Sequence, residues 1–419
     1  MIQEPRKTLV GFFPGFFDVG ETFPLIKIAK SYQALGGEVV IFSHGGDYEY
    51  LAKEHGFDPI QINPIASKSK ITRYFLEGSD DEIIELIRSE ASEFKKSKIK
   101  LLVQSSSYLD CMMAARVSKI PLVSMIPGTL IPPYYQANLG TYPDRSENYF
   151  TYMMPRYFKD RLSNWFSLNY KGEVTKKFNR VAQKMNVDIF LKNDQDIRLG
   201  DFTLMCDDIN FLAVKPSKEF PAEHYIGPIL FDEPPGQEDK EVKNHLKRSG
   251  RSILLTMGSS PFMKERFLKV LKILNKTDYN VIATYTNILN EDELPKLNEN
   301  ILFKKFIPNV AELNKKIDLA IIGGGRGTVY TAAYSGKPAV GIPLNGEQQY
   351  NLDCLVRHGV AKRLSFTFLQ EKNLLDAIDG IFKNYDTYLK NGQDLLKKLP
   401  VPQGDKNAAK QILKIAMQS

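Results

Sequence analysis

Short apolar runs alternate with helical patterns along this 419-residue sequence, and this alternation constrains the fold more than any other feature. Apolar runs bounded by turn residues are typical of buried parallel strands. Apolar residues three and four positions apart are typical of the helices between such strands. One such series occurs in each half of the chain, which is too long for a single compact core. The sequence therefore predicts an α/β fold with two doubly wound parallel sheets.

The first half contains the elements of one sheet. The expected strands cover residues 8–13, 38–43, 99–103 and 121–126. Pro24 is expected to open a helix, because proline is well suited to a first helical turn. The apolar face of this helix carries Leu25, Ile28, Ala29, Tyr32 and Leu35, and Gly36 and Gly37 end it.

The second half repeats the pattern after a break. Residues 227–240 are rich in proline, glycine and acidic residues, as linkers are. The strands expected beyond this break cover residues 251–257, 280–284, 301–303, 318–322 and 338–342, and a last helix covers 407–417. We therefore expect an N-terminal domain of residues 1–228, a linker at 229–248, a C-terminal domain at 249–400, and a helix at 401–419 that packs back on the first domain.

The chain is basic, with a net charge of +7 and a pI near 8.9. This balance favours anionic partners such as nucleotide diphosphates or anionic lipid surfaces. Nucleic acid is disfavoured, because the sequence has neither zinc-finger spacing nor an aromatic RNA-binding signature. No apolar run approaches the roughly 18 residues that a membrane-spanning helix needs, so we expect a soluble protein.

The cysteines and histidines form no recognisable ligand pattern. Cys111, Cys206 and Cys354 are far apart and suit neither a disulfide framework nor a zinc cluster, which fits a reducing cytoplasm. The five histidines lack ligand spacing, and no metal site is expected. Asp194 and Asp196 form a metal-binding-like pattern, but their polar surroundings favour a solvated loop.

A glycine-rich stretch at residues 321–328 is the densest functional signal. An apolar strand runs into Gly323, Gly324 and Gly325 and then into a helix that begins near Arg326. Glycines let backbone N–H groups approach a ligand, and a helix N-terminus favours phosphate. The alternative is a sharp turn that binds nothing.

Three other predicted strand ends carry polar or aromatic residues suited to one ligand. Gly258 and Ser259 suit phosphate oxygens, Phe306 and Asn309 suit a nucleotide base, and Glu347 with Gln348 suits sugar hydroxyls. Because ligands of parallel sheets bind beyond the carboxyl ends of the strands, these residues are expected to share a crevice.

In this order, the motifs resemble the C-terminal half of the family-1 glycosyltransferases. The resemblance covers residues 252–364 and rests on Gly258-Ser259, Phe306 to Asn309, the glycine turn with Thr328, Gly336 to Pro338, and Pro343 through Glu347 and Gln348 to Asn351. Gly20 to Leu25 and Tyr225 to Pro228 extend it more weakly into the first half. The resemblance implies a GT-B fold, two facing Rossmann-like domains with an interdomain cleft. It also implies metal-independent, inverting transfer from a UDP or dTDP sugar, a co-substrate, with no further cofactor.

The resemblance also assigns roles to residues. It places Gly258, Ser259, Gly325, Arg326, Gly327 and Thr328 on the diphosphate, Phe306 and Asn309 on the base, and Glu347 and Gln348 on the sugar. Two positions depart from the family. Its diphosphate-contacting histidine is replaced by Gly323, and its glutamine by Asn309. We expect Arg326 to supply the missing positive charge, the alternative being that it only caps an exposed turn.

The catalytic base is expected just after the first strand. Where the family has histidine or aspartate, this chain has Glu21, and Asp18 is the rival. A carboxylate can remove the proton of an acceptor hydroxyl if its pKa is raised by partial burial. Either acid also suits a helix N-terminus, which is the alternative without chemistry.

Residues 130–170 mix aromatic, methionine and basic residues. One interpretation is a set of loops and helices that shape an acceptor pocket. The other is a peripheral membrane contact, with Arg156, Lys159 and Arg161 facing anionic headgroups. Both imply a largely apolar acceptor, a small molecule or a lipid. Two other functions stay open: a sugar-nucleotide epimerase and a non-catalytic binding partner of another transferase.

Overall fold

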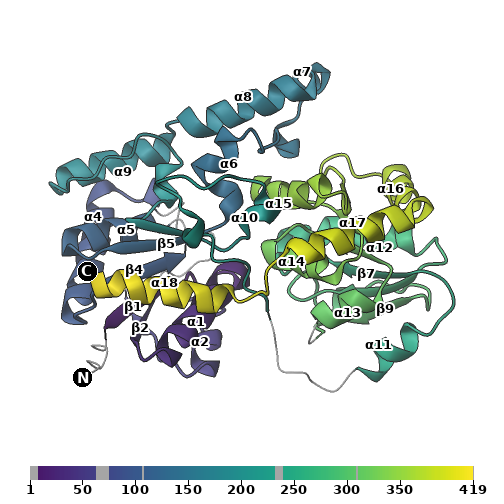
Figure 1. The fold of residues 1–419 in the computed structure, drawn as a ribbon, viewed down its shortest axis with the longest axis horizontal. Coiled ribbons are helices and arrows are strands. Elements are labelled where there is room, and N and C mark those ends of the chain that lie inside the picture. The colour runs from purple at the N-terminus through teal and green to yellow at the C-terminus, as the bar shows by residue number, and fades with distance from the viewer. Residues whose placement is uncertain (1–7, 63–74, 106–107, 232–238, 308–309, 419) are drawn as a thin grey trace. The chain divides into compact units, whose positions relative to one another are not determined.

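The computed structural model describes residues 8–62, 75–105, 108–231, 239–307 and 310–418. It forms two compact units (Figure 1). The first unit comprises Met1–Asn138, Leu162–Ile229 and Pro402–Ser419, and the second comprises Leu139–Arg161 and Leu230–Val401. Within the described residues, no helix is long and apolar enough to cross a membrane.

The first unit is built on a six-stranded parallel sheet of order β3-β2-β1-β4-β5-β6. Its strands are β1 (Leu9–Phe13), β2 (Glu38–Ser43), β3 (Ile60–Gln61), β4 (Leu101–Ser105), β5 (Leu122–Ile126) and β6 (Phe202–Met205). Successive side chains of a strand point to opposite faces, so Phe12 and Phe13 enter two different hydrophobic cores.

Helices cover both faces of this sheet. The helices are α1 (Val19–Ala34), α2 (Tyr50–Glu54), α4 (Asp80–Lys96), α5 (Leu109–Ser118), α6 (Pro132–Gln136), α9 (Glu173–Lys184), α10 (Ile209–Leu212) and α18 (Gly404–Gln418). The core around Phe13 contains α4, α5 and α9, and the core around Phe12 contains α1 and α18. Helices α7 (Tyr149–Met153) and α8 (Arg156–Asn169) lie in the segment where the chain leaves and re-enters this unit.

The last helix is part of the first unit's core. In Figure 1, α18 lies beside α1, and Ile412 and Ile415 are buried with Ile28. Ser31 Oγ donates a 2.5 Å hydrogen bond to a carboxylate oxygen of Asp405, which fixes the start of α18.

The second unit has an equivalent parallel sheet of order β12-β11-β10-β7-β8-β9. Its strands are β7 (Ser252–Thr256), β8 (Asn280–Thr284), β9 (Ile301–Lys304), β10 (Leu319–Ile322), β11 (Ala339–Gly341) and β12 (Ala361–Arg363). Its helices are α11 (Lys240–His245), α12 (Lys264–Leu274), α13 (Val310–Lys316), α14 (Arg326–Ser335), α15 (Gly346–Arg357), α16 (Glu371–Lys383) and α17 (Tyr385–Lys398). Helices α12 and α16 share one core with the sheet.

Short 3-10 turns connect several of these elements. They are η1 (Gly128–Leu130), η2 (Asp144–Ser146), η3 (Asp196–Arg198), η4 (Ala222–His224), η5 (Pro261–Met263) and η6 (Glu291–Glu293).

The predicted fold class, two doubly wound α/β sheets, is confirmed. One helix start was predicted wrongly. Pro24 lies inside α1 rather than opening it, because the Asp18 side chain caps the helix a turn earlier by accepting from the Glu21 amide. The expected linker at 229–248 contains α11, and its residues 232–238 lie outside the described residues. Residues 139–161 group with the second unit, whereas the sequence had suggested the first domain.

Each sheet has one point where the strand order reverses. In the first sheet this point lies between β1 and β4, and in the second between β7 and β10. Ligands of open parallel sheets bind beyond the strand ends at such a point. The loops after these four strands are therefore the places to look for function.

Candidate functional site

The loops after β7 and β10 touch each other. Thr256 pairs with Ile322 at the ends of these two strands, so the following residues leave the sheet side by side. A Cβ atom placed on Gly323 would lie 2.7 Å from the carbonyl oxygen of Met257. Gly258, the next residue, has a φ of 79°, a conformation that favours glycine. Two glycines thus let the two backbones meet at the switch point.

The tight contact at Gly323 also leaves little room for the histidine that the resembled family has there. The family has a histidine at this position, but here the Met257 backbone occupies the space that its Cβ would need. The loss of the side chain is therefore built into the local packing of the two loops.

Gly324 lets the same turn pack closely against helix α15. Its φ is 86°, and a Cβ there would lie 2.7 Å from the Gln348 carbonyl oxygen and 2.8 Å from Leu352. The glycine turn and the first turn of α15 are therefore in direct contact. This brings the predicted diphosphate residues next to the predicted sugar residues.

Helix α14 begins directly at the glycine turn. Gly325 is its N-cap and supplies no side chain, so no side-chain cap is present at this helix start. The Thr328 hydroxyl donates to the Gly325 carbonyl at 2.8 Å, and around the exposed Gly327 there is open space for a Cβ. Arg326, half-buried, is the first helical residue. A helix start of this kind has amides and a partial positive charge to offer an anion.

Gln348 is partly committed to the start of α15. Its backbone N–H donates to the Asn345 side chain at 3.0 Å, and its side-chain oxygen accepts from the Leu344 N–H at 2.8 Å. These reciprocal bonds stabilise the first turn of the helix. The Nε2 amide is then the part of Gln348 that we expect to meet a ligand.

Asn351 connects the two parts of the site, and its role was not predicted. Its buried side-chain amide donates to the Gly324 carbonyl oxygen at 3.2 Å and approaches Glu347 Oε1 at 3.4 Å. It thereby links the glycine turn to the carboxylate at the start of α15. The sequence signal was present, since Asn351 closes the motif that begins at Pro343.

The residues predicted for the nucleotide base lie further along the same sheet edge. Phe306 follows β9, two strands from β7, and is 46% exposed. Its ring contacts the Phe231 ring edge-on, with centroids 6.3 Å apart. Asn309 lies outside the described residues. Ser259 is half-exposed beside Gly258.

In the first unit, the two candidate bases have different surroundings. Asp18 is exposed, and its Oδ1 accepts from the Glu21 backbone N–H at 2.9 Å, so it acts as the N-cap of α1. Glu21 is half-buried in the first helical turn. A capping carboxylate is already engaged with the backbone, which makes Glu21 the better candidate of the two.

Tyr108 lies beside Glu21 and was not predicted. A Cβ on Gly15 would overlap the Tyr108 hydroxyl oxygen and lie 3.0 Å from Glu21 Oε2, so both groups crowd the same glycine. Burial and the nearby Glu21 and Asp18 carboxylates raise the pKa of Tyr108 well above its usual value. The Tyr108 hydroxyl therefore keeps its proton to a higher pH than an ordinary tyrosine, and it lies near the Glu21 carboxylate.

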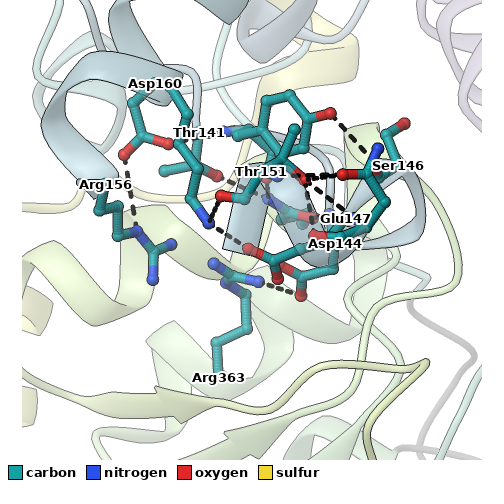
Figure 2. A network of polar contacts seen from close by, with 12 residues as sticks. Thr141, Asp144, Ser146, Glu147, Thr151, Arg156, Asp160 and Arg363 are labelled. Carbon is teal, nitrogen blue, oxygen red and sulfur yellow. Dashed lines mark hydrogen bonds and ion pairs between the residues drawn. The ribbon is translucent and has the colours of Figure 1, made fainter. Parts of the chain in front are cut away.

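A second polar network, shown in Figure 2, connects the segment 139–161 to the rest of the second unit. Arg363 Nε donates to Asp353 at 2.7 Å, and its Nη1 is ion-paired with Asp144. Gln349 donates to the Thr141 hydroxyl at 2.7 Å. Because Gln349 and Asp353 lie on α15, this helix supports both the glycine turn and the segment 139–161.

A buried polar cluster lies apart from these sites in the first unit. His44 Nε2 lies 2.9 Å from Glu90 Oε1 and 3.5 Å from Asp110 Oδ2, and its Nδ1 donates to the Ile62 carbonyl at 2.5 Å. The three side chains offer ligand atoms close enough together to hold a metal ion. Sequence spacing did not reveal this group, because its members come from the loop after β2, from α4 and from α5.

The Asp194 and Asp196 pair is engaged in loop structure. Asp194 accepts from the Gly172 N–H at 2.9 Å, and Asp196 accepts from the Lys192 N–H at 2.6 Å. Asp196 therefore stabilises a local turn, and Asp194 ties the loop to the N-cap residue of α9.

Residues 252–411 match the model of the Glycosyltransferase family 28 C-terminal domain. This range includes the loops after β7, β10 and β11, where the glycine turn and the start of α15 lie. Together with the two doubly wound sheets, the match decides the assignment. The chain has the GT-B fold, and its C-terminal half resembles the glycosyltransferases of family 28.

Curated relatives of this GT-B chain include two bacterial proteins. The uncharacterized UDP-glucosyltransferase YojK of Bacillus subtilis (strain 168) is 24% identical over 283 residues, which cover 65% of each chain. The UDP-N-acetylglucosamine--N-acetylmuramyl-(pentapeptide) pyrophosphoryl-undecaprenol N-acetylglucosamine transferase of Bacillus cytotoxicus is 28% identical over 38% of this chain and 46% of that protein. The match thus spans less than two thirds of either relative.

Solved structures of natural-product glycosyltransferases share the fold of the GT-B chain over nearly its whole length. The calicheamicin glycosyltransferase CalG4 aligns with a TM-score of 0.68 and 15% identity, covering 99% of both chains. The glycosyltransferase VinC, solved in complex with DTDP, aligns with a TM-score of 0.65 and 13% identity, covering 98% of this chain and 100% of VinC.

Proposed function

We propose that this GT-B chain transfers a sugar from a nucleoside diphosphate donor to a hydroxyl of a largely apolar acceptor, with inversion at the anomeric carbon and without a metal ion. One observation carries the proposal. At the switch point of the second sheet, Gly258, the glycine turn and the start of α14 share one edge, and Asn351 joins this turn to Glu347.

The donor diphosphate is the ligand that best suits the start of α14. Gly325 to Thr328 present the first helical turn, where amide groups and the helix dipole favour an anion. The Arg326 side chain would add a positive charge where the resembled family has a histidine. Stabilising the departing diphosphate is the main electrostatic demand of this reaction.

The donor sugar and base are assigned to the neighbouring strand ends. The Glu347 carboxylate and the Gln348 Nε2 amide would bind sugar hydroxyls beside the glycine turn, and Phe306 would stack on the base. The complex of VinC with DTDP supports a nucleoside diphosphate as the ligand class.

Glu21 is the proposed general base. Its carboxylate would take the proton of the acceptor hydroxyl as the sugar becomes oxocarbenium-like. Tyr108 would orient this carboxylate, and Asp18 would hold the helix start. A carboxylate base needs no partner to fix a tautomer, unlike a histidine.

A panel of nucleotide sugars, each incubated with and without apolar acceptors, tests the function. Acceptor-dependent release of UDP or dTDP, with an inverted anomeric configuration by NMR, is the expected result. Conversion of the nucleotide sugar without an acceptor would indicate an epimerase. Binding without turnover would indicate a non-catalytic partner of another transferase.

A further inference from the structure

Helix α8 exposes five large apolar side chains and directs three polar ones, Lys159, Asp160 and Asn164, toward the protein. A helix on the surface of a globular protein normally does the reverse. The exposed apolar residues are Tyr157, Phe158, Leu162, Trp165 and Phe166, with exposed fractions of 63%, 62%, 55%, 61% and 50%. The buried residue of this helix is a polar one, Asn164.

Polar contacts fix this orientation of the helix. The Asp160 carboxylate accepts from the Tyr142 backbone N–H at 2.7 Å. Lys159 is ion-paired with Glu147 and is only 12% exposed (Figure 2 shows Asp160, Glu147 and Thr151). One of the two interpretations of residues 130–170 placed Lys159 against lipid headgroups, but its charge is instead compensated by Glu147.

Helix α7 extends the exposed apolar surface. Tyr149, Phe150 and Met153 are exposed by 85%, 75% and 68%. We call the eight side chains on the two helices the α7–α8 face: Tyr149, Phe150, Met153, Tyr157, Phe158, Leu162, Trp165 and Phe166. Apolar side chains scattered singly on a surface need no explanation, but eight exposed ones on two successive helices are more than that and are typical of an interaction site.

The charge and composition of this face point to its partner. Residues 149–171 include four basic residues and one acidic residue, Asp160. Lys159 is ion-paired with Glu147 and Arg156 with Asp160, so Arg161 and Lys171 are the basic residues of this stretch outside these two ion pairs. The Arg156 side chain is 61% exposed, and Arg161 stacks over the Tyr157 ring and donates to its hydroxyl at 2.6 Å. Tyrosine and tryptophan favour the boundary between headgroups and acyl chains, and basic residues beside them favour anionic lipids. The net charge of +7 also favours attraction of the whole chain to an anionic surface.

We propose that the α7–α8 face binds the surface of a lipid bilayer that carries anionic headgroups. Phe158 and Leu162 would enter the acyl boundary, Trp165 would lie at headgroup level, and Arg156 and Arg161 would contact the anionic groups. The proposal concerns adsorption from one side of the bilayer and is independent of the transfer reaction.

Trp165 provides the test, because it is the single tryptophan of the chain. The full-length protein is titrated with vesicles of phosphatidylcholine alone and with vesicles that also contain phosphatidylglycerol. We expect a blue shift of tryptophan emission, quenching by brominated acyl chains, and co-sedimentation that is at least tenfold stronger with the anionic vesicles. Raising the salt concentration should weaken the binding.

A double variant, Phe158→Ser with Leu162→Ser, should lower the vesicle partition coefficient at least tenfold and keep the thermal unfolding temperature. The matched control is Phe368→Ser with Val401→Ser, which removes two side chains that are 47% and 69% exposed elsewhere, and should bind as the parent does. An equal loss of vesicle binding in the two double variants would overturn the proposal.

Two further results would overturn it. One is the absence of any Trp165 response to anionic vesicles. The other is a concentration-dependent dimer in sedimentation velocity, with a blue shift that needs no lipid, since the face would then bind a second copy. None of these measurements uses a nucleotide or an acceptor, so their failure would leave the proposed transferase reaction untouched.

Discussion

The side-chain amide of Asn351 donates to the carbonyl oxygen of Gly324 over 3.2 Å, and so joins helix α15 to the glycine turn. The bond is buried and crosses 27 residues of sequence. It holds together the two elements proposed to bind the diphosphate and the sugar of the donor.

Asn351→Ala should weaken donor binding more than it weakens the fold. Losing a buried hydrogen bond destabilises a protein by about 1–3 kcal/mol, and the displaced turn should raise the Kd for UDP or dTDP by about tenfold or more. Calorimetry and thermal unfolding measure the two effects. Asn391→Ala is the matched control, because Asn391 makes a similar 3.0 Å bond to the Gly359 carbonyl away from the site. Equal nucleotide affinity in both variants would contradict the proposed role of Asn351.

Gly323→His, which restores the residue of the resembled family, should not improve activity. Its Cβ would lie 2.7 Å from the Met257 carbonyl oxygen. Overpacking of this kind costs about 1–3 kcal/mol, so urea unfolding should show a lower stability. Gly327→Ala has open space around its Cβ and serves as the control for the fold. If the Gly323→His protein were as stable as the parent, the loops after β7 and β10 would have moved apart at little cost, which would contradict the predicted overpacking.

Glu21→Gln should lower kcat by about 10²–10⁴-fold, as expected for loss of a general base, with little change in donor affinity. Asp18→Ala should cost about 1 kcal/mol of stability, because it removes an N-cap, and should lower kcat far less. Steady-state kinetics with saturating donor separate the two. A larger loss of kcat in Asp18→Ala would reverse the roles assigned to these acids.

The cluster of His44, Glu90 and Asp110 should make the first unit less stable as pH rises. Burial lowers the pKa of His44, but its bonds to Asp110 and Glu90 outweigh this and raise the pKa from 6.5 to about 11. Burial and the Asp110 charge raise the pKa of Glu90 from 4.5 to about 8. Both groups therefore bind more protons in the folded state, so their stabilisation is complete at low pH. It declines from about pH 4.5 to 8 for Glu90 and from about pH 6.5 to 11 for His44.

Urea titrations at several pH values between 5 and 9 measure this dependence. Glu90→Gln should keep the stability of the parent near pH 5 and flatten the decline up to pH 8. Glu85→Gln, an exposed substitution on the same helix, should follow the parent curve. If the stability of Glu90→Gln fell with pH as the parent's does, the titration of Glu90 would not be the cause of the decline.

Most strands and the glycine turn were predictable, because hydrophobic periodicity and glycine punctuation are local signals. The short strands β3, β6 and β12 were not predicted. The start of α1 was misplaced by one turn, because a capping bond of Asp18 prevailed over the usual position of proline. Tyr108 and the His44 cluster were missed, because their neighbours come from distant parts of the sequence. The exposed side of α8 was missed for the same reason, since contacts such as Asp160 with Tyr142 decide which side of a helix faces inward.

Helix α18 gives the chain an unusual order of assembly during synthesis. The core of the first unit includes Ile412 and Ile415, which leave the ribosome after every residue of the second unit. Domains usually fold as they emerge, starting from the N-terminus. The first unit therefore begins to be synthesised first but receives its last core helix after the second unit is complete. Until then the apolar side of α1 that α18 covers is exposed and could bind a chaperone.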